Sequence, residues 1–277
     1  MKIGIVCEGG GMRGSYTAGV LEAFMREGFV ADELVGVSAG ASNGVSYVSG
    51  QQGRGIRTNL DYCNDKRYMG VRSYVKTGSF FGMDFIFGEI PNKLDPFDWE
   101  AFYASPCAFY AGVTDVETGR AVFFGKRDIR PGLAVLRASC SIPVLSPVVH
   151  YNGGQYLDGG VAAPIPIDKA LEDGCDRLVV ILTRQRGYRK KPQHMRLLYK
   201  RRFANHPDME KAIGLRYMVY NHTLERLERL EQEGKAIVIA PTTQLPVDRM
   251  ARDRAKLEQA CNQGIQDGLA ALPVIGR

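Results

Sequence analysis

The stretch KIGIVCEGGGMRGSYTAG, residues 2–19, joins a short apolar run to four closely spaced glycines and then to a helix-like segment. The run KIGIV predicts a buried strand. The apolar residues after the glycines recur with helical spacing as far as Gly28, a residue typical of a helix end. A glycine-rich corner between a strand and a helix is a place where backbone N–H groups can hold a negative charge. The stretch therefore predicts an α/β fold with an anion-binding corner.

Strand-like and helix-like segments alternate along the rest of the chain. Further buried strands are expected at 33–37, 177–183 and 236–240, and antiparallel hairpins at 109–125 and 146–160, the latter turning at Asn152-Gly153. Helices are expected after residue 38, within 165–174, from about 213 to Gly234, and over 249–271. This alternation predicts a layered α/β fold with a mostly parallel sheet and a local antiparallel insertion.

The composition is that of an ordinary globular protein. The 277 residues are 45% hydrophobic and 24% charged, and the net charge of +6 is too mild to indicate nucleic-acid binding. The six cysteines have neither metal-ligand nor redox spacing, so we expect free thiols, no metal site and a cytoplasmic location. The chain starts with a strand rather than a signal peptide, and no apolar run approaches the ~20 residues that span a bilayer.

The glycine corner has more than one possible ligand. Gly9, Gly11 and Gly14 have the spacing of a dinucleotide-binding fingerprint, but that fingerprint also needs an acidic residue at the end of the second strand, where this chain has Ser38. The Lys-Ser/Thr pair of a P-loop does not follow Gly14. A nucleotide- or flavin-binding module remains an alternative, although the chain has only half of the dinucleotide-binding fingerprint. A second alternative is that the glycines only allow close packing of the helix on the strand.

An oxyanion hole is a third use of the same corner. Consecutive glycines let backbone N–H groups converge without side chains in the way, and the following helix adds the positive end of its dipole. Donors fixed around a developing oxyanion lower a barrier by ~3–4 kcal/mol each. Arg13 would reinforce that field or anchor the loop.

The second strand runs into GVSAG, residues 36–40, a G-x-S-x-G sequence. A serine in this position lies on a sharp strand-to-helix turn that exposes its oxygen, and the flanking Gly36 and Gly40 keep side chains out of the turn. Adjacent parallel strands would present Ser38 and the glycine corner at one sheet edge. A tight turn with a capping serine is the alternative.

A nucleophilic serine needs a proton acceptor. None of the four histidines, His150, His194, His206 and His222, stands at a convincing strand end, although His150 in its hairpin is kept as an alternative base. Asp158 closes a short strand before Gly159-Gly160, and desolvation with a direct hydrogen bond to serine would raise its basicity. The other interpretation is an aspartate that only satisfies its own turn.

Together, EGGGMRG (8–14), GVSAG (36–40) and DGG (158–160) resemble, in order and interval, the motifs of the patatin-like phospholipases. The resemblance covers about residues 3–182 and implies a catalytic region 1–182, followed by a C-terminal segment 183–277 packed on the same domain. It implies a three-layer α/β/α fold with a mostly parallel sheet and no cofactor or metal. Ser38 would be the nucleophile and Asp158 its base. The oxyanion donors would be Gly10, Gly11 and Met12, supported by Arg13; Gly9, Gly14, Gly36, Gly40, Gly159 and Gly160 are the motif glycines.

The resemblance implies hydrolysis of an acyl lipid through an acyl-serine, with a thioesterase or general carboxylesterase as the alternative. A noncatalytic lipid-binding protein would not need the serine–aspartate pair. The phenylalanine-rich segment 78–91 would form an acyl-channel wall, a lid or plain core. The run 184–202 holds nine Arg or Lys and no acid, and is either a solvated loop or a contact with anionic lipid at the inner face of the membrane. The sequence does not indicate an oligomeric state.

Overall fold

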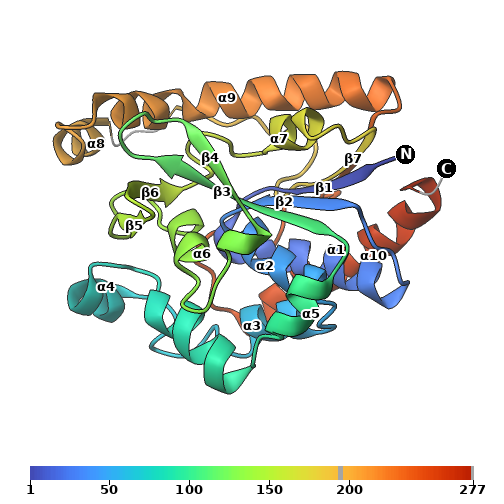
Figure 1. Cartoon of the computed structure of the whole chain (residues 1–277), viewed down its shortest axis with the longest axis horizontal. Helices are drawn as coiled ribbons and strands as arrows, with labels where there is room; N and C mark the ends of the chain where they lie inside the picture. The colour runs from blue at the N-terminus through green and yellow to red at the C-terminus, as the bar shows by residue number, and fades with distance from the viewer. Residues whose placement is uncertain (193–195, 276–277) are drawn as a thin grey trace.

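The computed structural model describes residues 1–192 and 196–275. Its centre is an eight-stranded sheet with helices on both faces (Figure 1). The strand order is β5-β6-β3-β2-β1-β7-β8, with β4 also paired to β3. The strands are β1 (Ile3–Cys7), β2 (Glu33–Val37), β3 (Ala108–Asp115), β4 (Ala121–Gly125), β5 (Val149–Tyr151), β6 (Gly154–Asp158), β7 (Arg177–Ile181) and β8 (Ala236–Ile239).

The helices form the two outer layers. In Figure 1, α7 and α9 lie on one side of the sheet, and α1, α2 and α10 lie on the other. The described helices are α1 (Gly14–Arg26), α2 (Ala39–Val48), α3 (Arg54–Leu60), α4 (Val71–Thr77), α5 (Trp99–Ala104), α6 (Ala134–Ser139), α7 (Ile167–Glu172), α8 (Arg196–Arg202), α9 (Pro207–Gln232) and α10 (Arg254–Ile275). Three short helical segments complete the set: η1 (Gly11–Arg13), η2 (Phe85–Leu94) and η3 (Lys126–Asp128).

The central strands bury both of their faces, because successive side chains of a strand point to opposite sides. Ile5 of β1 belongs to the core shared with α1, α2 and α10, whereas the next residue, Val6, belongs to the core shared with α7 and α9. Apolar runs such as KIGIV therefore separate two cores. The predicted α/β fold, with three layers and a mostly parallel sheet, is confirmed.

Strand register determines which residues meet at the carboxyl ends of the parallel strands. Strands β1, β2, β3, β7 and β8 are parallel, so the residues after β1 and β2 emerge at the same sheet edge. Strand β3 runs past the end of β2, where Val37 pairs with Gly112. The antiparallel β6 pairs with this overhang, Val113 opposite Asp158. Asp158, the last residue of β6, therefore lies close to the end of β2.

Both predicted hairpins are present, and Asn152 (φ 45°) and Gly153 (φ 80°) make the tight turn between β5 and β6. The expected final helix over 249–271 is wrong at both ends, because α10 begins at Arg254 and continues to Ile275. Residue 249 instead docks on the glycine corner, where the Arg249 carbonyl accepts a hydrogen bond from the Met12 N–H (3.1 Å). Among the described residues, no helix combines the length and the apolar character needed to cross a bilayer.

Candidate active site

Ser38 occupies a strained corner between β2 and α2. Its backbone has φ 53° and ψ −126°, a conformation that residues other than glycine rarely adopt. The flanking glycines are required by close packing: a Cβ at Gly36 would lie 2.6 Å from the Ala41 nitrogen, and one at Gly40 would lie 2.5 Å from the Cys7 oxygen. The G-x-S-x-G sequence thus forms the sharp turn that it predicts.

A buried serine braces this corner. The Ser38 N–H donates to Oγ of Ser139 (2.8 Å), and the Ser139 hydroxyl donates in turn to the Gly112 carbonyl (2.7 Å). Ser139, the last residue of α6, is fully buried. No local spacing in the sequence marks Ser139, because its role depends on contacts that are distant in the chain.

The Ser38 hydroxyl donates to Oδ2 of Asp158 at 2.8 Å. Both side chains are buried, with 8% of Ser38 and 6% of Asp158 exposed. The second carboxylate oxygen, Oδ1, accepts the Gly160 N–H (2.7 Å), so the carboxylate is oriented from both sides. Gly159 lies so close to β3 that a Cβ would be 2.1 Å from the Gly112 oxygen. We call Ser38 and Asp158 the dyad.

The glycine corner lies directly beside the nucleophile. A Cβ at Gly9 would be 3.1 Å from the Ser38 Cβ. Gly10 lacks room for a side chain because a Cβ would be 2.8 Å from the Thr183 hydroxyl. Gly11 has φ 57°, and a Cβ there would be 2.5 Å from Cγ of Arg249. The corner is thus held between the end of β7 and the segment before α10.

The N–H groups of this corner are not equivalent. The Met12 N–H already donates to the Arg249 carbonyl (3.1 Å), and the Arg13 N–H donates to the Gly10 carbonyl (3.3 Å). Within residues 1–192 and 196–275, the N–H groups of Gly10 and Gly11 have no hydrogen-bond acceptor. Of the three donors expected, Gly10 and Gly11 are therefore available to a ligand, and Met12 is not.

Arg13 is buried behind the corner, with 5% of its surface exposed, and its Nε has no hydrogen-bond partner among the described residues. Burial lowers the pKa of Arg13 to about 10; the nearby Arg184 acts in the same direction, and Glu8 opposes it. The Glu8 carboxylate accepts hydrogen bonds from the Thr183 N–H (2.6 Å) and hydroxyl (3.1 Å). The Arg13 side chain thus contributes positive charge near the corner and, among the described residues, no hydrogen bond to it.

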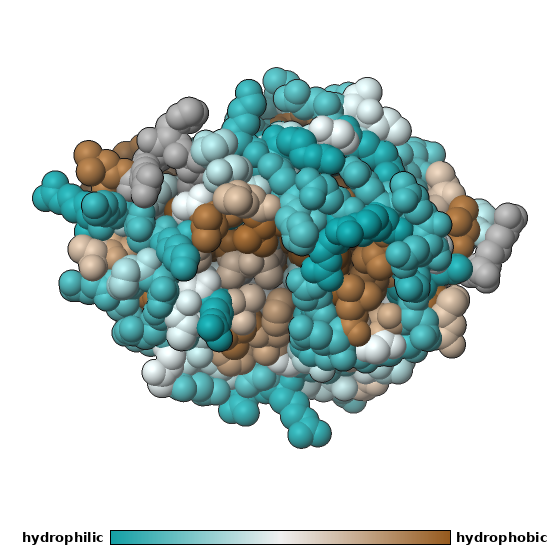
Figure 2. Space-filling view, turned by 90° about the horizontal axis from the view of Figure 1, so that it is seen from above, coloured by the Kyte–Doolittle hydropathy of each residue, from teal (hydrophilic) through white to brown (hydrophobic). Residues whose placement is uncertain are grey.

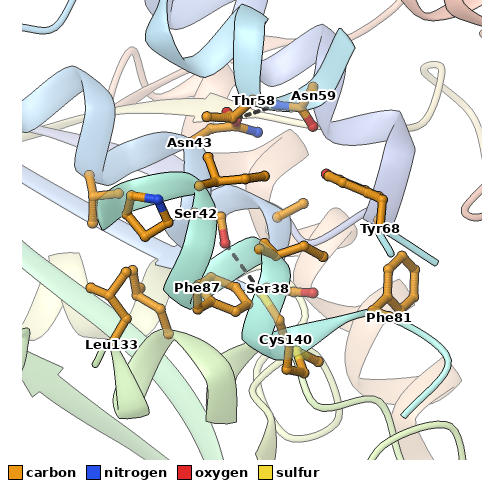
Figure 3. Close-up of a pocket in the computed structure, with 18 of the residues that line it drawn as sticks. Ser38, Ser42, Asn43, Thr58, Asn59, Tyr68, Phe81, Phe87, Leu133 and Cys140 are labelled. Carbon is orange, nitrogen blue, oxygen red and sulfur yellow. Dashed lines mark hydrogen bonds between the residues drawn. The ribbon is translucent and has the colours of Figure 1, made fainter. Parts of the chain in front are cut away.

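A mostly apolar cavity opens at Ser38 (Figure 3) and encloses about 930 Å³, its mouth included. In that view Phe81 and Phe87 lie on opposite sides of the Ser38 side chain. The segment 78–91 supplies much of the wall, through Phe81, Met83, Ile86, Phe87, Ile90 and Pro91. The sequence allowed three interpretations of this segment, as a channel wall, a lid or plain core. The structure shows that it forms a wall of the cavity and that its Phe85 also packs in the core.

Cys140 lines the same cavity, and its sulfur lies 3.3 Å from the Ser42 hydroxyl. Burial raises the pKa of Cys140 to about 12, so the group is a neutral thiol at physiological pH. Among the described residues, no group of three or more His, Cys, Asp or Glu side chains is placed to hold a metal ion.

The histidines lie away from the dyad. His150, the alternative base, is exposed on β5, whereas the Ser38 hydroxyl bonds to Asp158. His206 lies 3.5 Å from Glu117 and His222 lies 3.9 Å from Glu225. His194 is outside the described residues. Asp158 is the carboxylate that accepts the hydrogen bond of the Ser38 hydroxyl.

Similarity to known proteins covers most of the chain. The profile described as patatin-like phospholipase matches residues 5–171, and a domain of unknown function (DUF6363) matches residues 206–277. The chain is 32% identical to the uncharacterized protein YjjU of Escherichia coli over 193 residues, covering 66% of this chain and 52% of YjjU.

The chain is also 23% identical to lysophospholipase NTE1 of Saccharomyces cerevisiae over 293 residues, which is 96% of this chain and 16% of that protein. It thus spans about half or less of these relatives. The solved structure of VipD from Legionella pneumophila aligns with a TM-score of 0.47 and 12% identity, over 99% of this chain and 66% of VipD. Because the patatin-like profile covers more than half of the sequence and includes all three glycine-containing motifs, the chain belongs to the patatin-like phospholipase family.

Proposed function

We propose that this chain hydrolyses fatty-acyl ester bonds of lipids, with Ser38 as nucleophile and Asp158 as its base. The observation that carries the proposal is the 2.8 Å hydrogen bond between Ser38 Oγ and Asp158 Oδ2 at the mouth of a mostly apolar cavity. The name of the relative NTE1, a lysophospholipase, supports a lipid ester as substrate.

The first half of the reaction acylates the serine. The Ser38 oxygen attacks the ester carbonyl carbon while Asp158 accepts the hydroxyl proton. The carbonyl oxygen becomes an oxyanion that accepts hydrogen bonds from the Gly10 and Gly11 N–H groups, beside the positive end of α1. When the tetrahedral intermediate collapses, the bond to the alcohol oxygen breaks and Asp158 donates its proton to that oxygen.

The second half releases the fatty acid. A water molecule attacks the acyl-serine carbonyl, Asp158 accepts a proton from it, and the Ser38 oxygen leaves with that proton. During both steps the acyl chain occupies the apolar cavity lined by Phe81, Phe87 and Ile90.

A substrate panel tests the proposal. Purified protein is assayed against phospholipids, lysophospholipids, acylglycerols and acyl thioesters of one chain length, beside Ser38→Ala. We expect fatty-acid release from oxygen esters of lipids and its loss in Ser38→Ala. Turnover confined to thioesters would instead favour the thioesterase alternative, and release that survives Ser38→Ala would refute the nucleophile.

We also propose peripheral contact with an anionic membrane at the cytoplasmic face, made by α8 and α4. Figure 1 shows both helices at one end of the molecule, and Figure 2 shows hydrophobic atoms among hydrophilic ones at the end where α8 lies. Leu197 of α8 is 82% exposed and Val75 of α4 is 81% exposed. Basic side chains flank both, which suits an anionic lipid surface.

Not all of the basic run 184–202 is available for this contact. Arg186 forms an ion pair with Glu231 (2.8 Å) and Arg189 with Glu228 (2.8 Å), both on α9. The cations of α8, such as Lys200 and Arg201, project from the same short helix as the exposed Leu197. The proposed contact is therefore narrower than the whole run, and Met195 of that run lies outside the described residues.

A further inference from the structure

A second, smaller hollow adjoins the apolar cavity at Ser38. It encloses about 340 Å³, its mouth included, and is bounded by the glycine corner, Pro143, Val161 and the dyad. Of the two dyad side chains, Ser38 lines both spaces and Asp158 lines the smaller one. The alcohol that leaves from the ester must receive its proton from Asp158. The smaller hollow is therefore where that alcohol lies, on the proposed mechanism.

Two arginines line this hollow. Arg216 comes from α9, and Arg249 comes from the segment between β8 and α10. Nε of Arg216 is buried without a hydrogen-bond partner, and neither guanidinium forms an ion pair or hydrogen bond with any other described residue. The buried Arg54 differs, because its Nε lies 3.7 Å from the Asp95 carboxylate. Arg216 as a whole is half-buried, but a buried guanidinium N–H without a partner is costly, so the orphaned Nε of Arg216 indicates an anionic ligand.

The carboxylates of Asp158 and Glu8 act on Arg216 through space, but among the described residues no carboxylate forms an ion pair with either arginine. Glu8 is engaged by Thr183, and Asp158 is engaged by Ser38 and the Gly160 N–H. The Asp158 carboxylate also stands on the side of the hollow where the alcohol proton must be delivered. The hollow therefore has its own base on one side and, on the other, two arginines that have no ion-pair partner among the described residues.

Other cations strengthen this positive field. Lys190 is half-buried with its ammonium 4.6 Å from the centre of the Tyr220 ring. Burial lowers the pKa of Lys190 to about 7; Arg216, Arg249 and Arg13 act in the same direction, and Glu8 opposes them. Mutual repulsion among these groups is relieved when an anion enters.

We propose that Arg216 and Arg249 bind a phosphate carried by the leaving alcohol, so that the preferred substrate is an acyl ester of a phosphate-bearing alcohol such as glycerol phosphate. This inference rests on the proposed hydrolase function and names its substrate class. Arginine suits the role because its planar guanidinium donates two parallel hydrogen bonds to phosphate oxygens. The acyl chain and the headgroup then occupy the two spaces that meet at Ser38.

The proposal also gives a role to the C-terminal segment. Arg216 and Arg249 both lie within residues 206–277, the part matched by the domain of unknown function. Arg249 is held against the glycine corner by the hydrogen bond from the Met12 N–H to its carbonyl (3.1 Å). The segment thus supplies the headgroup contacts, while the patatin-like part supplies the dyad and the acyl cavity.

Matched substrates test the inference by hydrolysis. The value of kcat/KM is measured in mixed micelles for 1-palmitoyl-glycerol 3-phosphate and for uncharged 1-palmitoyl-glycerol. We expect wild type to favour the phosphate ester and Arg216→Met or Arg249→Met to reduce that ratio by about 10- to 100-fold, since charge-assisted hydrogen bonds are lost. Arg216→Lys should restore part of the ratio. An unchanged ratio in both methionine variants would overturn the headgroup assignment.

The control variant is Arg229→Met, because Arg229 is an exposed arginine on the same helix, α9, about 20 Å from Arg216 along its axis. It should keep the wild-type ratio, so an equal fall there would mean a general charge effect and would also refute the subsite. Thermal unfolding of each variant identifies loss of fold, and Arg249→Met keeps the test available if Arg216→Met does not fold.

Binding of non-hydrolysable ether lipids separates this inference from the hydrolase proposal. Wild type should bind 1-O-hexadecyl-glycerol 3-phosphate more tightly than 1-O-hexadecyl-glycerol, and Arg216→Met should lose the difference, whether or not esters are cleaved. Equal affinities in wild type would overturn the subsite. Inorganic phosphate binding as tightly as the ether phosphate, with the same dependence on Arg216, would assign a free anion instead of a lipid headgroup and would also overturn it.

Discussion

The backbone N–H of Met12 donates to the backbone carbonyl of Arg249 (3.1 Å), residues 237 positions apart that join the glycine corner to the C-terminal segment. This bond removes Met12 from the donors available to an oxyanion. It also orients the neighbouring Gly10 and Gly11 beside Ser38. The C-terminal segment is thus part of the proposed catalytic site as well as part of the fold.

Gly11→Ala tests this junction. The residue has φ 57°, and an added Cβ would lie 2.5 Å from Cγ and 2.6 Å from the oxygen of Arg249. We expect kcat to fall by about 10²-fold as the corner is displaced from the position of an oxyanion donor. Gly28→Ala is the matched control, with φ 68° and open space around its Cβ, and should cost about 1 kcal/mol of stability with kcat retained. Equal loss of kcat in both variants would contradict a specific role for the corner.

Ser139→Ala tests the brace on the nucleophile. The change leaves the Ser38 N–H and the Gly112 carbonyl without their buried partner, which should cost about 1–3 kcal/mol of folding stability. We expect kcat to fall about tenfold while KM changes little, because the Ser38 corner loses its orientation. Ser141→Ala is the control: its equally buried hydroxyl bonds only the Arg137 carbonyl (2.8 Å), so stability should fall and kcat should not. Equal kcat values in the two variants would show that Ser139 does not orient the Ser38 corner.

Ile86→Trp tests the acyl cavity, because Ile86 lines its wall within η2. The larger side chain should fill part of the cavity and shift the chain-length optimum toward shorter acyl groups, measured with p-nitrophenyl esters from four to sixteen carbons. Leu94→Trp, on the same segment but 43% exposed, should leave the chain-length profile as in wild type. A profile that Ile86→Trp leaves unchanged would place the acyl chain elsewhere.

Vesicle binding tests the proposed membrane contact. Leu197→Glu together with Val75→Glu replaces two exposed apolar side chains by acids, and should reduce sedimentation with anionic vesicles several-fold. Val30→Glu is the control, since Val30 is 61% exposed and precedes β2, at the opposite edge of the sheet from Ser38. Equal sedimentation of wild type, the double variant and Val30→Glu would show that α8 and α4 do not contact the membrane.

The pH dependence of stability tests the buried cation. Burial lowers the pKa of Lys190 to about 7, whereas the unfolded chain has the ordinary value of 10.5. Between these values the unfolded state binds more protons, so this group makes the protein more stable as pH rises above about 7. Lys190→Met should lose that increase, seen as a smaller change of Tm between pH 7 and 9. Equal Tm changes in wild type and variant would show that the pKa of Lys190 is not lowered in the folded protein.

The sequence predicts this fold well where a signal is local. The runs KIGIV, ELVGV and RLVVILT mark buried strands because both faces of a central strand are apolar, and Asn152-Gly153 marks a tight hairpin. The start of the last helix was missed because residue 249 bonds to Met12, a contact no local pattern encodes. The segment 78–91 stayed ambiguous because apolar side chains line a cavity and a core with the same pattern.

The residues of the proposed site also differ in whether the local sequence marks them. Ser38 and Asp158 lie in short motifs whose glycines are needed for close packing, so their positions in the sequence point to their role. Ser139, Arg216 and Arg249 have no such neighbours. Each acquires its place through the sheet register or through packing of the C-terminal segment, and only the assembled fold brings them to Ser38.

The central claim is that Asp158 activates the Ser38 oxygen, and active-site labelling measures it most directly. The second-order rate of labelling by a fluorophosphonate is determined for wild type, Ser38→Ala and Asp158→Asn, each shown to be folded by its thermal unfolding. We predict modification at Ser38 in wild type, none in Ser38→Ala, and a rate lower by about 10³-fold or more in Asp158→Asn. Labelling of Asp158→Asn at the wild-type rate, or of Ser38→Ala at all, would contradict it.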